Sequence, residues 1–237
     1  MDTKNYIIDR IKNSDVSIDP WKHLIVEDFL PQSLYEGIKK ETSVYIEKMK
    51  MYKPENKGVR GYHVNVNMSM NVFPSSSEPY LTEYYEILLD RDIENIIKEK
   101  VFLNGYHKNI ESVDMYGTFD VMTSGFTYDE VHPDHEAKMI TMIHYLADEC
   151  DDESLGTLLY SPKTDGSKQS VVDDIVLKTR YISNCVLFFA PCWKTGFMSN
   201  HSMMHHSKTT PFRKTLQNFW LREKSNWTRP QSGRILL

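Results

Sequence analysis

Residues Tyr128 to Leu146 read YDEVHPDHEAKMITMIHYL, and this stretch decides the fold that we expect for the chain. It begins with a His-Pro-Asp step, His132 to Asp134, and continues from residue 139 as an apolar run typical of a buried strand. In an extended chain, residues i and i+2 point to the same face, so His132 and Asp134 can direct an imidazole and a carboxylate at one point. Two histidines and one carboxylate make an open-sited ligand set for Fe(II). The rest of the chain must therefore supply a second histidine.

Composition limits the class of protein. The chain has 237 residues, 40% of them hydrophobic and 26% charged, which suits a globular domain. A net charge of -5 gives no broad basic surface for nucleic acid. Three cysteines without metal-type spacing indicate a reducing compartment. No apolar run is long enough to cross a membrane, and the first residues do not form a secretion signal. We therefore expect a soluble cytoplasmic protein.

Hydrophobic periodicity separates a helical part from a strand-rich part. Apolar residues at helical spacing predict helices over residues 4–13, 31–51 and 81–101. Strands are predicted over residues 22–29, 61–72, 112–122, 139–147, 156–160, 175–179, 181–190, 197–204 and 212–221. Many short strands after helices suggest an α+β protein, in which a β-sandwich or a jelly-roll barrel has helices packed outside it. We expect one domain over residues 1–237, with a helix-rich part (about 1–105) and a strand-rich core (about 110–222).

The second histidine is expected within residues 188–221, which read FFAPCWKTGFMSNHSMMHHSKTTPFRKTLQNFWL. His201, His205 and His206 compete for the role. Strand alternation places His201 and His205 on one face and His206 on the other, so His206 fits a regular strand least well. If the strand has a bulge or begins later, His206 could still be the ligand. We favour His201 and leave the other two as alternatives.

Arginine and threonine follow on the last predicted strand. Arg213 and Thr215 are two residues apart and therefore share a face. A guanidinium beside a hydroxyl can hold a carboxylate, as a dicarboxylate co-substrate such as 2-oxoglutarate requires. In contrast, Lys138 is expected to be solvated, and His135 and His144 are not expected to be metal ligands.

Four segments together resemble the Fe(II)/2-oxoglutarate-dependent dioxygenases, in particular the prolyl 4-hydroxylase-like branch. PWKHLIVEDFLPQSLYEGI resembles the N-terminal strand and helix of that branch, and HPDHEAKMITMIHYLAD resembles its His-x-Asp segment. LGTLLYSP resembles the glycine-rich strand, although it has one glycine where two are common. HSMMHHSKTTPFRKTL resembles the distal His and Arg-x-Ser/Thr segment, and part of it is also similar to the phytanoyl-CoA dioxygenase branch.

The resemblance implies a double-stranded β-helix, which is a jelly-roll or cupin-like barrel, with the N-terminal helices packed outside it. It also assigns roles to residues. His132, Asp134 and His201 would be the catalytic iron ligands. The implied cofactors are Fe(II) and 2-oxoglutarate, and ascorbate is a further candidate. An aspartate at position 134 argues against a halogenase, which leaves that position free for chloride.

The same resemblance implies a co-substrate site. Arg213, helped by Thr215, would bind the distal carboxylate of 2-oxoglutarate. Tyr145 falls where the branch places a tyrosine whose hydroxyl reaches that carboxylate. From the residues alone, a core tyrosine that hydrogen-bonds to the backbone would give the same pattern.

The reaction implied is hydroxylation, with dioxygen as a substrate and succinate and carbon dioxide as products. The prime substrate is unidentified: the N-terminal resemblance favours a protein side chain such as proline, and the phytanoyl-like segment allows a small molecule. Two alternatives are a non-oxidative cupin-type barrel that binds a metal or a small acid, and an interaction module without a metal.

Overall fold

The computed structural model describes residues 2–51, 63–64, 78–102, 111–123, 126–127, 131–135, 137–163, 173–192, 198–205, 207, 209–210 and 212–222. Within these residues, no helix has the length and the apolar character needed to cross a membrane. The α-helices are α1 (Thr3–Asn13), α2 (Gln32–Met51), α3 (Pro79–Leu88) and α4 (Arg91–Val101). The first two confirm the helices expected over residues 4–13 and 31–51.

The expectation of one helix over residues 81–101 is wrong, because the chain breaks between α3 and α4. Asp90 lies outside the helical conformation, and its carboxylate accepts a hydrogen bond from the Asp92 backbone N–H at 2.9 Å. Such an N-cap satisfies one of the N–H groups that a helix start leaves without a partner. The apolar pattern alone does not reveal the break, since both helices bury their apolar side chains in the same core.

A seven-stranded antiparallel sheet forms the centre of the protein, in the order β1-β2-β9-β6-β12-β4-β3. Its strands are β1 (Val16–Ser17), β2 (His23–Val26), β3 (His63–Val64), β4 (Asp114–Thr123), β6 (Lys138–Tyr145), β9 (Cys185–Phe189) and β12 (Phe212–Leu221). The strands expected over residues 112–122, 139–147, 181–190 and 212–221 are thus confirmed. Of the strand expected over 61–72, residues 63–64 are described, and the others lie outside the described residues.

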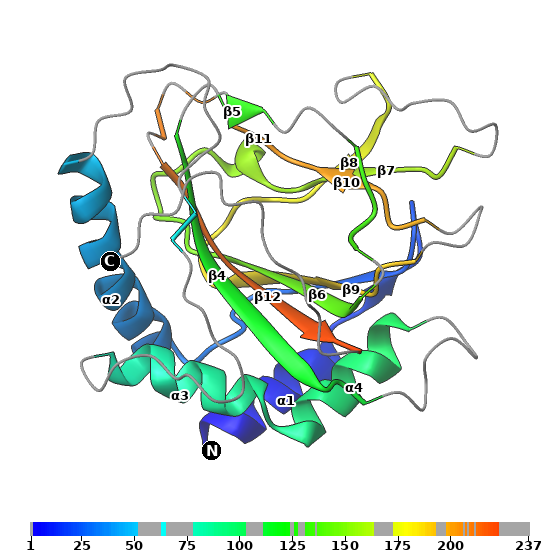
Figure 1. Cartoon of the computed structure of the whole chain (residues 1–237), viewed down its shortest axis with the longest axis horizontal. Helices are drawn as coiled ribbons and strands as arrows, with labels where there is room; N and C mark the ends of the chain where they lie inside the picture. The colour runs from blue at the N-terminus through cyan, green and yellow to red at the C-terminus, as the bar shows by residue number, and fades with distance from the viewer. Residues whose placement is uncertain are drawn as a thin grey trace.

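Two smaller antiparallel sheets complete the strands of the described chain. One has the order β10-β7-β8, from β7 (Leu158–Tyr160), β8 (Ile175–Lys178) and β10 (His201–Ser202), and the other pairs β5 (Phe126–Thr127) with β11 (Met204–His205). The strand expected over 197–204 is therefore two short strands in different sheets. Figure 1 shows β7, β8 and β10 over one face of the large sheet, with α1, α3 and α4 below the other face. The fold is a mixture of helices and antiparallel sheets, and closure into a jelly-roll barrel stays a prediction.

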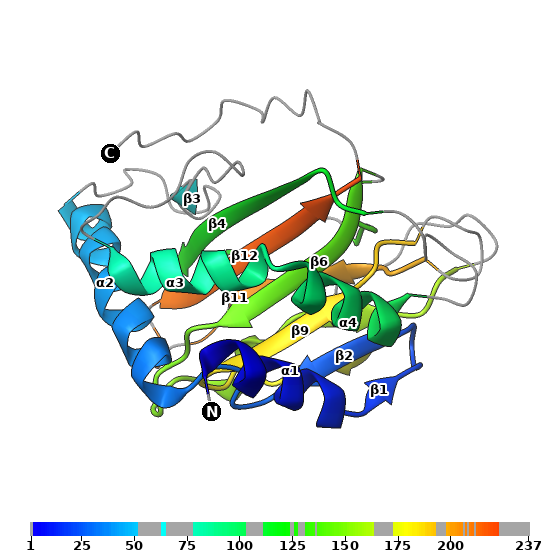
Figure 2. The ribbon, with the colours of Figure 1, turned by 90° about the horizontal axis from the view of Figure 1, so that it is seen from below.

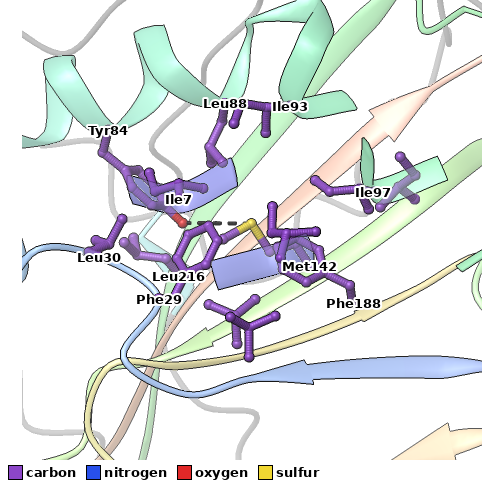
Figure 3. Packing of buried hydrophobic residues seen from close by; sticks show 14 of the residues in the cluster. Ile7, Phe29, Leu30, Tyr84, Leu88, Ile93, Ile97, Met142, Phe188 and Leu216 are labelled. Carbon is purple, nitrogen blue, oxygen red and sulfur yellow. Dashed lines mark hydrogen bonds between the residues drawn. The ribbon is translucent and has the colours of Figure 1, made fainter. Parts of the chain in front are cut away.

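Side-chain alternation gives the central strands two different faces. One face packs against the helices that cross it in Figure 2. In Figure 3, helical residues meet strand residues there, and the Tyr84 hydroxyl lies 3.9 Å from the Met142 sulfur. We call the opposite face the inner face; its residues include Thr141, Ile143, Tyr145, Leu187, Phe189, Arg213, Thr215 and Phe219. A second buried cluster covers part of the inner face and includes Tyr145, Leu155, Leu159, Tyr181, Leu187 and Phe189.

His144 is a fully buried histidine on the helical side of β6. Its ring lies 5.7 to 5.8 Å from the rings of Phe29, Tyr35 and Tyr84. Burial lowers the pKa of His144 from 6.5 to about 3, and the Asn184 side chain offsets this only in part. His144 is therefore neutral in the folded protein at pH 7 and takes no part in the site on the inner face.

The depressed pKa of His144 makes folding stability depend on pH. The unfolded chain binds the proton below about pH 6.5 and the folded chain does not, so this contribution is lost as the pH falls from about 6.5 towards 3. We expect His144→Leu to gain about 2–3 kcal/mol of unfolding free energy relative to wild type between pH 7 and pH 4.5. Urea denaturation at both pH values measures this, with the exposed His135→Leu as control. Parallel profiles for wild type and His144→Leu would contradict the prediction.

Candidate metal centre

His132 and His201 lie directly opposite each other in an antiparallel bridge. The His132 N–H donates to the His201 carbonyl at 3.1 Å, and the His201 N–H donates to the His132 carbonyl at 3.0 Å. Their rings are 4.7 Å apart. These two residues are distant in sequence, and the backbone hydrogen bonds between them fix the relative positions of their Cα atoms.

The segment before His201 is held in place from two sides. The Trp21 indole N–H and the Tyr160 backbone N–H both donate to the Asn200 carbonyl, at 3.1 Å each. The sequence did not indicate this role of Trp21, because its partner lies 179 residues away. Trp21 belongs to the PWKH stretch on which the family resemblance partly depends.

Asp134 completes the group. One ligand atom from each of His132, Asp134 and His201 lies within 4.8 Å of the others, so the three could hold a metal ion. His201 and Asp134 are buried and His132 is half-buried. The Nδ1 of His201 is 3.0 Å from the Ser199 carbonyl. Nδ1 then carries the proton, and Nε2, which is 3.9 Å from Asp134 Oδ2, keeps its lone pair for a metal.

Among the described side chains, one of the three candidate histidines lies beside His132 and Asp134. His201 joins His132 and Asp134, as expected from the sequence. His205 lies in β11, whose backbone pairs with Phe126 of β5. His206 lies outside the described residues. Alternation could not make this choice, since the chain leaves one sheet after Ser202 and enters another at Met204.

The charges of the group suit metal binding. Burial lowers the pKa of His201 to about 4, because the charged ring is poorly solvated there, although the Asp134 carboxylate acts in the opposite direction. Burial would raise the pKa of Asp134, but the Lys138 ammonium, His201 and the Thr141 hydroxyl together hold it well below its usual range. At neutral pH the site thus offers a carboxylate and a neutral imidazole, the forms that bind metals.

Lys138 and Thr141 surround Asp134, and the sequence did not predict either contact. The expectation that Lys138 is solvated is wrong: it is buried, and its ammonium pairs with Asp134 Oδ1. Thr141 donates to Asp134 Oδ2 at 2.6 Å. The run from Lys138 to Tyr145 is buried at every position, so a charged residue at its start needed a partner. A lysine at the start of an apolar strand was therefore the feature of the sequence that could have indicated a buried ion pair.

Arg213 lies elsewhere on the inner face and is fully buried. Its Nε donates to the Leu155 carbonyl at 2.6 Å. Its guanidinium carbon is 5.5 Å from the centre of the Tyr145 ring and 5.7 Å from that of Tyr181. Its Nη2 has no hydrogen-bond partner within the described chain. A buried, unpaired guanidinium N–H is costly, so this atom is available to an acceptor that the described residues do not provide.

Thr215 and Tyr145 pair in register across β12 and β6. The Thr215 hydroxyl is buried and, like Arg213 Nη2, has no hydrogen-bond partner within the described residues. The Tyr145 hydroxyl is 2.8 Å from the hydroxyls of both Thr157 and Thr179. The Thr157 backbone N–H also donates to it, at 3.2 Å. Both residues therefore lie beside Arg213, and the co-substrate roles expected for them stay predictions.

The two groups share the inner face of the sheet. Thr141 and Phe219 are in register on β6 and β12, as are Tyr145 and Thr215. The first pair contacts Asp134 and Lys138, and the second lies beside Arg213. Four residues of strand span about 13 Å, so the metal-ligand group and the unpaired donors flank one stretch of the sheet.

No protein-family model matches the sequence, and no curated protein matches it. Solved structures do match its fold. A prolyl hydroxylase from Trichoplax adhaerens in complex with a hypoxia inducible factor oxygen degradation domain peptide fragment is 11% identical, with a TM-score of 0.55 over 93% of this chain and 90% of that one. A Pseudomonas putida prolyl-4-hydroxylase is 15% identical, with a TM-score of 0.52 over 92% and 99%. A Phytophthora capsici prolyl 4-hydroxylase is 12% identical, with a TM-score of 0.55 over 94% and 65%.

These matches define the fold. The chain shares the fold of these prolyl hydroxylases, as the resemblance of its sequence segments implied. Within that fold it carries a His-Asp-His group that could bind a metal.

Gly156 leaves no space for a side chain beside Tyr145. A Cβ there would lie 1.7 Å from the Thr179 carbonyl oxygen and 2.7 Å from the Thr179 hydroxyl, which also contacts Tyr145. We expect Gly156→Ala to lower the unfolding free energy by about 2 kcal/mol or more, because the backbone must move. Urea denaturation tests this, with the exposed Ser154→Ala as control, expected within about 0.5 kcal/mol of wild type. Equal unfolding free energies of Gly156→Ala and Ser154→Ala would contradict the prediction, because they would show that the backbone around Gly156 and Thr179 moves at little cost.

Proposed function

We propose that the protein is an Fe(II)- and 2-oxoglutarate-dependent dioxygenase that hydroxylates a substrate and releases succinate and carbon dioxide. One observation carries the proposal. A group of two histidines and one carboxylate shares a sheet face with a buried arginine whose Nη2 has no acceptor within the described chain. The two features together match the needs of an iron and a dicarboxylate bound side by side.

The chemistry of the donors fits Fe(II). His132, His201 and Asp134 would take three positions around the ion and leave others open. Bound iron and 2-oxoglutarate would together activate dioxygen for insertion of one oxygen atom into a C–H bond. The protein's own contribution is to fix the ligands. The backbone bridge fixes the two histidines, Ser199 fixes the tautomer of His201, and Thr141 fixes the carboxylate.

The unpaired donors at the Arg213 end of the inner face fit a carboxylate. Arg213 Nη2 and Thr215 Oγ1 are buried and unpaired within the described residues, so an anion would satisfy both at once. A charge-assisted hydrogen bond from arginine is stronger in a buried site than in water. We propose that Tyr145 contacts the same carboxylate: its proton would turn from Thr157 towards the ligand, while the Thr157 N–H continues to donate to its oxygen.

For the prime substrate we propose a protein side chain such as proline. The support is the fold: prolyl hydroxylases match over more than nine tenths of this chain, and one of those structures holds a peptide fragment. A small-molecule substrate is the alternative outcome. Incubation with proline-containing peptides, followed by mass spectrometry for a 16 Da increase, separates the two.

Anaerobic titration tests the iron site. We expect Fe(II) and 2-oxoglutarate together to give a charge-transfer band with wild-type protein, and His201→Ala to abolish it because a ligand is lost. His205→Ala and His206→Ala should keep the band. On admission of oxygen, with ascorbate present, wild type should form succinate. A band without succinate, with every candidate substrate, would favour a non-oxidative cupin-type binding protein. Absence of any metal binding would favour an interaction module.

Replacing Arg213 tests the co-substrate site. We expect Arg213→Lys to weaken 2-oxoglutarate binding by about 10-fold or more, because the buried guanidinium hydrogen bond to a charged group is lost. Metal affinity should be unchanged, since Arg213 lies outside the metal-ligand group. Arg180→Lys is the matched control, as Arg180 pairs with Glu153 on the surface. Unchanged 2-oxoglutarate affinity in Arg213→Lys would refute this role.

A further inference from the structure

Lys138 is a buried cation within the candidate metal centre. Its side chain is 8% exposed and that of Asp134 is 7% exposed, and the two are paired. The ammonium also lies over the Phe219 ring, 3.6 Å from its centre, where the ring's negative face favours a cation. The inference drawn from this pair rests on the proposed metal site.

The backbone holds Lys138 in this position. The Lys138 N–H donates to the His135 carbonyl at 2.9 Å, which closes a turn between Asp134 and the start of β6. The Arg222 N–H donates to the Ala137 carbonyl at 3.0 Å, which ties the turn to the end of β12. The lysine side chain therefore starts from a fixed backbone position four residues after Asp134, and its ammonium lies over the ring of Phe219.

The two oxygens of Asp134 have different surroundings. Oδ1 contacts the Lys138 ammonium. Oδ2 accepts from Thr141 at 2.6 Å and faces His201 Nε2 at 3.9 Å. A metal held by His201 and Asp134 would thus meet Oδ2, while Oδ1 stays with the lysine. The pairing favours a carboxylate that binds through one oxygen and disfavours one that binds through both.

The charge of Lys138 has a second effect. A metal about 2 Å from Oδ2 would lie roughly 6 Å from the ammonium on the far oxygen. At an effective dielectric constant of about 20, repulsion between one and two positive charges at that distance is worth several powers of ten in affinity. Local relaxation reduces this effect, so we take about tenfold as the smallest change to expect.

We propose that Lys138 is a positioning residue that sets both the denticity and the affinity of the metal centre. Its ammonium occupies Oδ1 of Asp134, presents Oδ2 as the single carboxylate ligand, and weakens the binding of a divalent cation. It also balances the buried carboxylate when no metal is bound, so the site keeps its shape without one.

Cobalt(II) is a suitable probe, because its visible spectrum reports coordination and needs no turnover. We expect Lys138→Met to bind Co(II) at least about tenfold more tightly than wild type, and to show weaker visible bands as the carboxylate becomes bidentate and the coordination number rises. Lys138→Gln keeps a donor to Oδ1 without the charge, so it should bind tightly and keep the wild-type spectrum. Lys138→Arg should restore both the affinity and the spectrum.

Thermal unfolding gives an independent measurement. Without metal, Lys138→Met should melt at a lower temperature than wild type, because a buried carboxylate has lost its partner, and Co(II) should raise its melting temperature by more. A lysine with a merely structural role would lower the melting temperature and leave Co(II) affinity unchanged. That result, or Co(II) binding weakened in both Lys138→Met and Lys138→Gln, would overturn the proposal. If Lys138→Met does not fold, Lys138→Gln alone decides the effect of the charge.

Failure of the underlying site gives a different result. If wild-type protein binds no Co(II), or binds it equally well as His201→Ala, the metal centre itself is wrong. If wild type binds Co(II) and His201→Ala does not, the metal centre stands, and the lysine variants test the role of Lys138 by themselves.

Discussion

Strand β12 has to satisfy two environments at once, and the rest of the structure depends on its register. It pairs with β4 along its whole length and with β6 on its other side. Leu216 faces the helical core, whereas Arg213 and Thr215 face inward. A slip of one residue would bury the guanidinium among apolar side chains and move Leu216 to the site. In the slipped alignment the guanidinium would lose its hydrogen bond to the Leu155 carbonyl and its contacts with the Tyr145 and Tyr181 rings, so the observed alignment is favoured.

Asn218 makes that register still more specific. It lies on the helical side of β12, where its amide donates to the Tyr84 hydroxyl at 2.9 Å. Its partner in β4 is Gly117, at which a Cβ would lie 2.9 Å from the Asn218 side-chain oxygen. A buried polar group that has a partner in only one alignment favours that alignment over its neighbours. The same contact links β12 to α3, so the helical layer helps to fix the strand that carries Arg213.

Much of this could be predicted from the sequence, and the remainder could not, for identifiable reasons. Continuous apolar runs predict the central strands, because these strands are buried on both faces of the sheet. The two-residue spacing of His132 and Asp134 predicts that their side chains lie on the same face. The position of His201 beside His132 depends on a backbone bridge between residues 69 positions apart, which no local pattern records. The sequence alone places Lys138 in solvent, because lysine side chains are seldom buried. The three-dimensional structure shows that Asp134 compensates for its burial.

The two ends of the inner face have opposite needs. Near Arg213 and Thr215, buried donors have no acceptor in the described chain, and each such group costs on the order of 1–3 kcal/mol of stability. Near Asp134, the carboxylate already has a cation in Lys138. An anionic ligand near Arg213 and Thr215 would therefore supply the acceptor that these buried donors lack. A metal at Asp134 would instead share the carboxylate with the Lys138 ammonium. Because a dicarboxylate that also binds the metal would neutralise part of its charge, such a ligand would weaken the repulsion from Lys138 and favour retention of the metal. The arrangement would thus couple the two proposed binding events through electrostatics alone, without a change in fold.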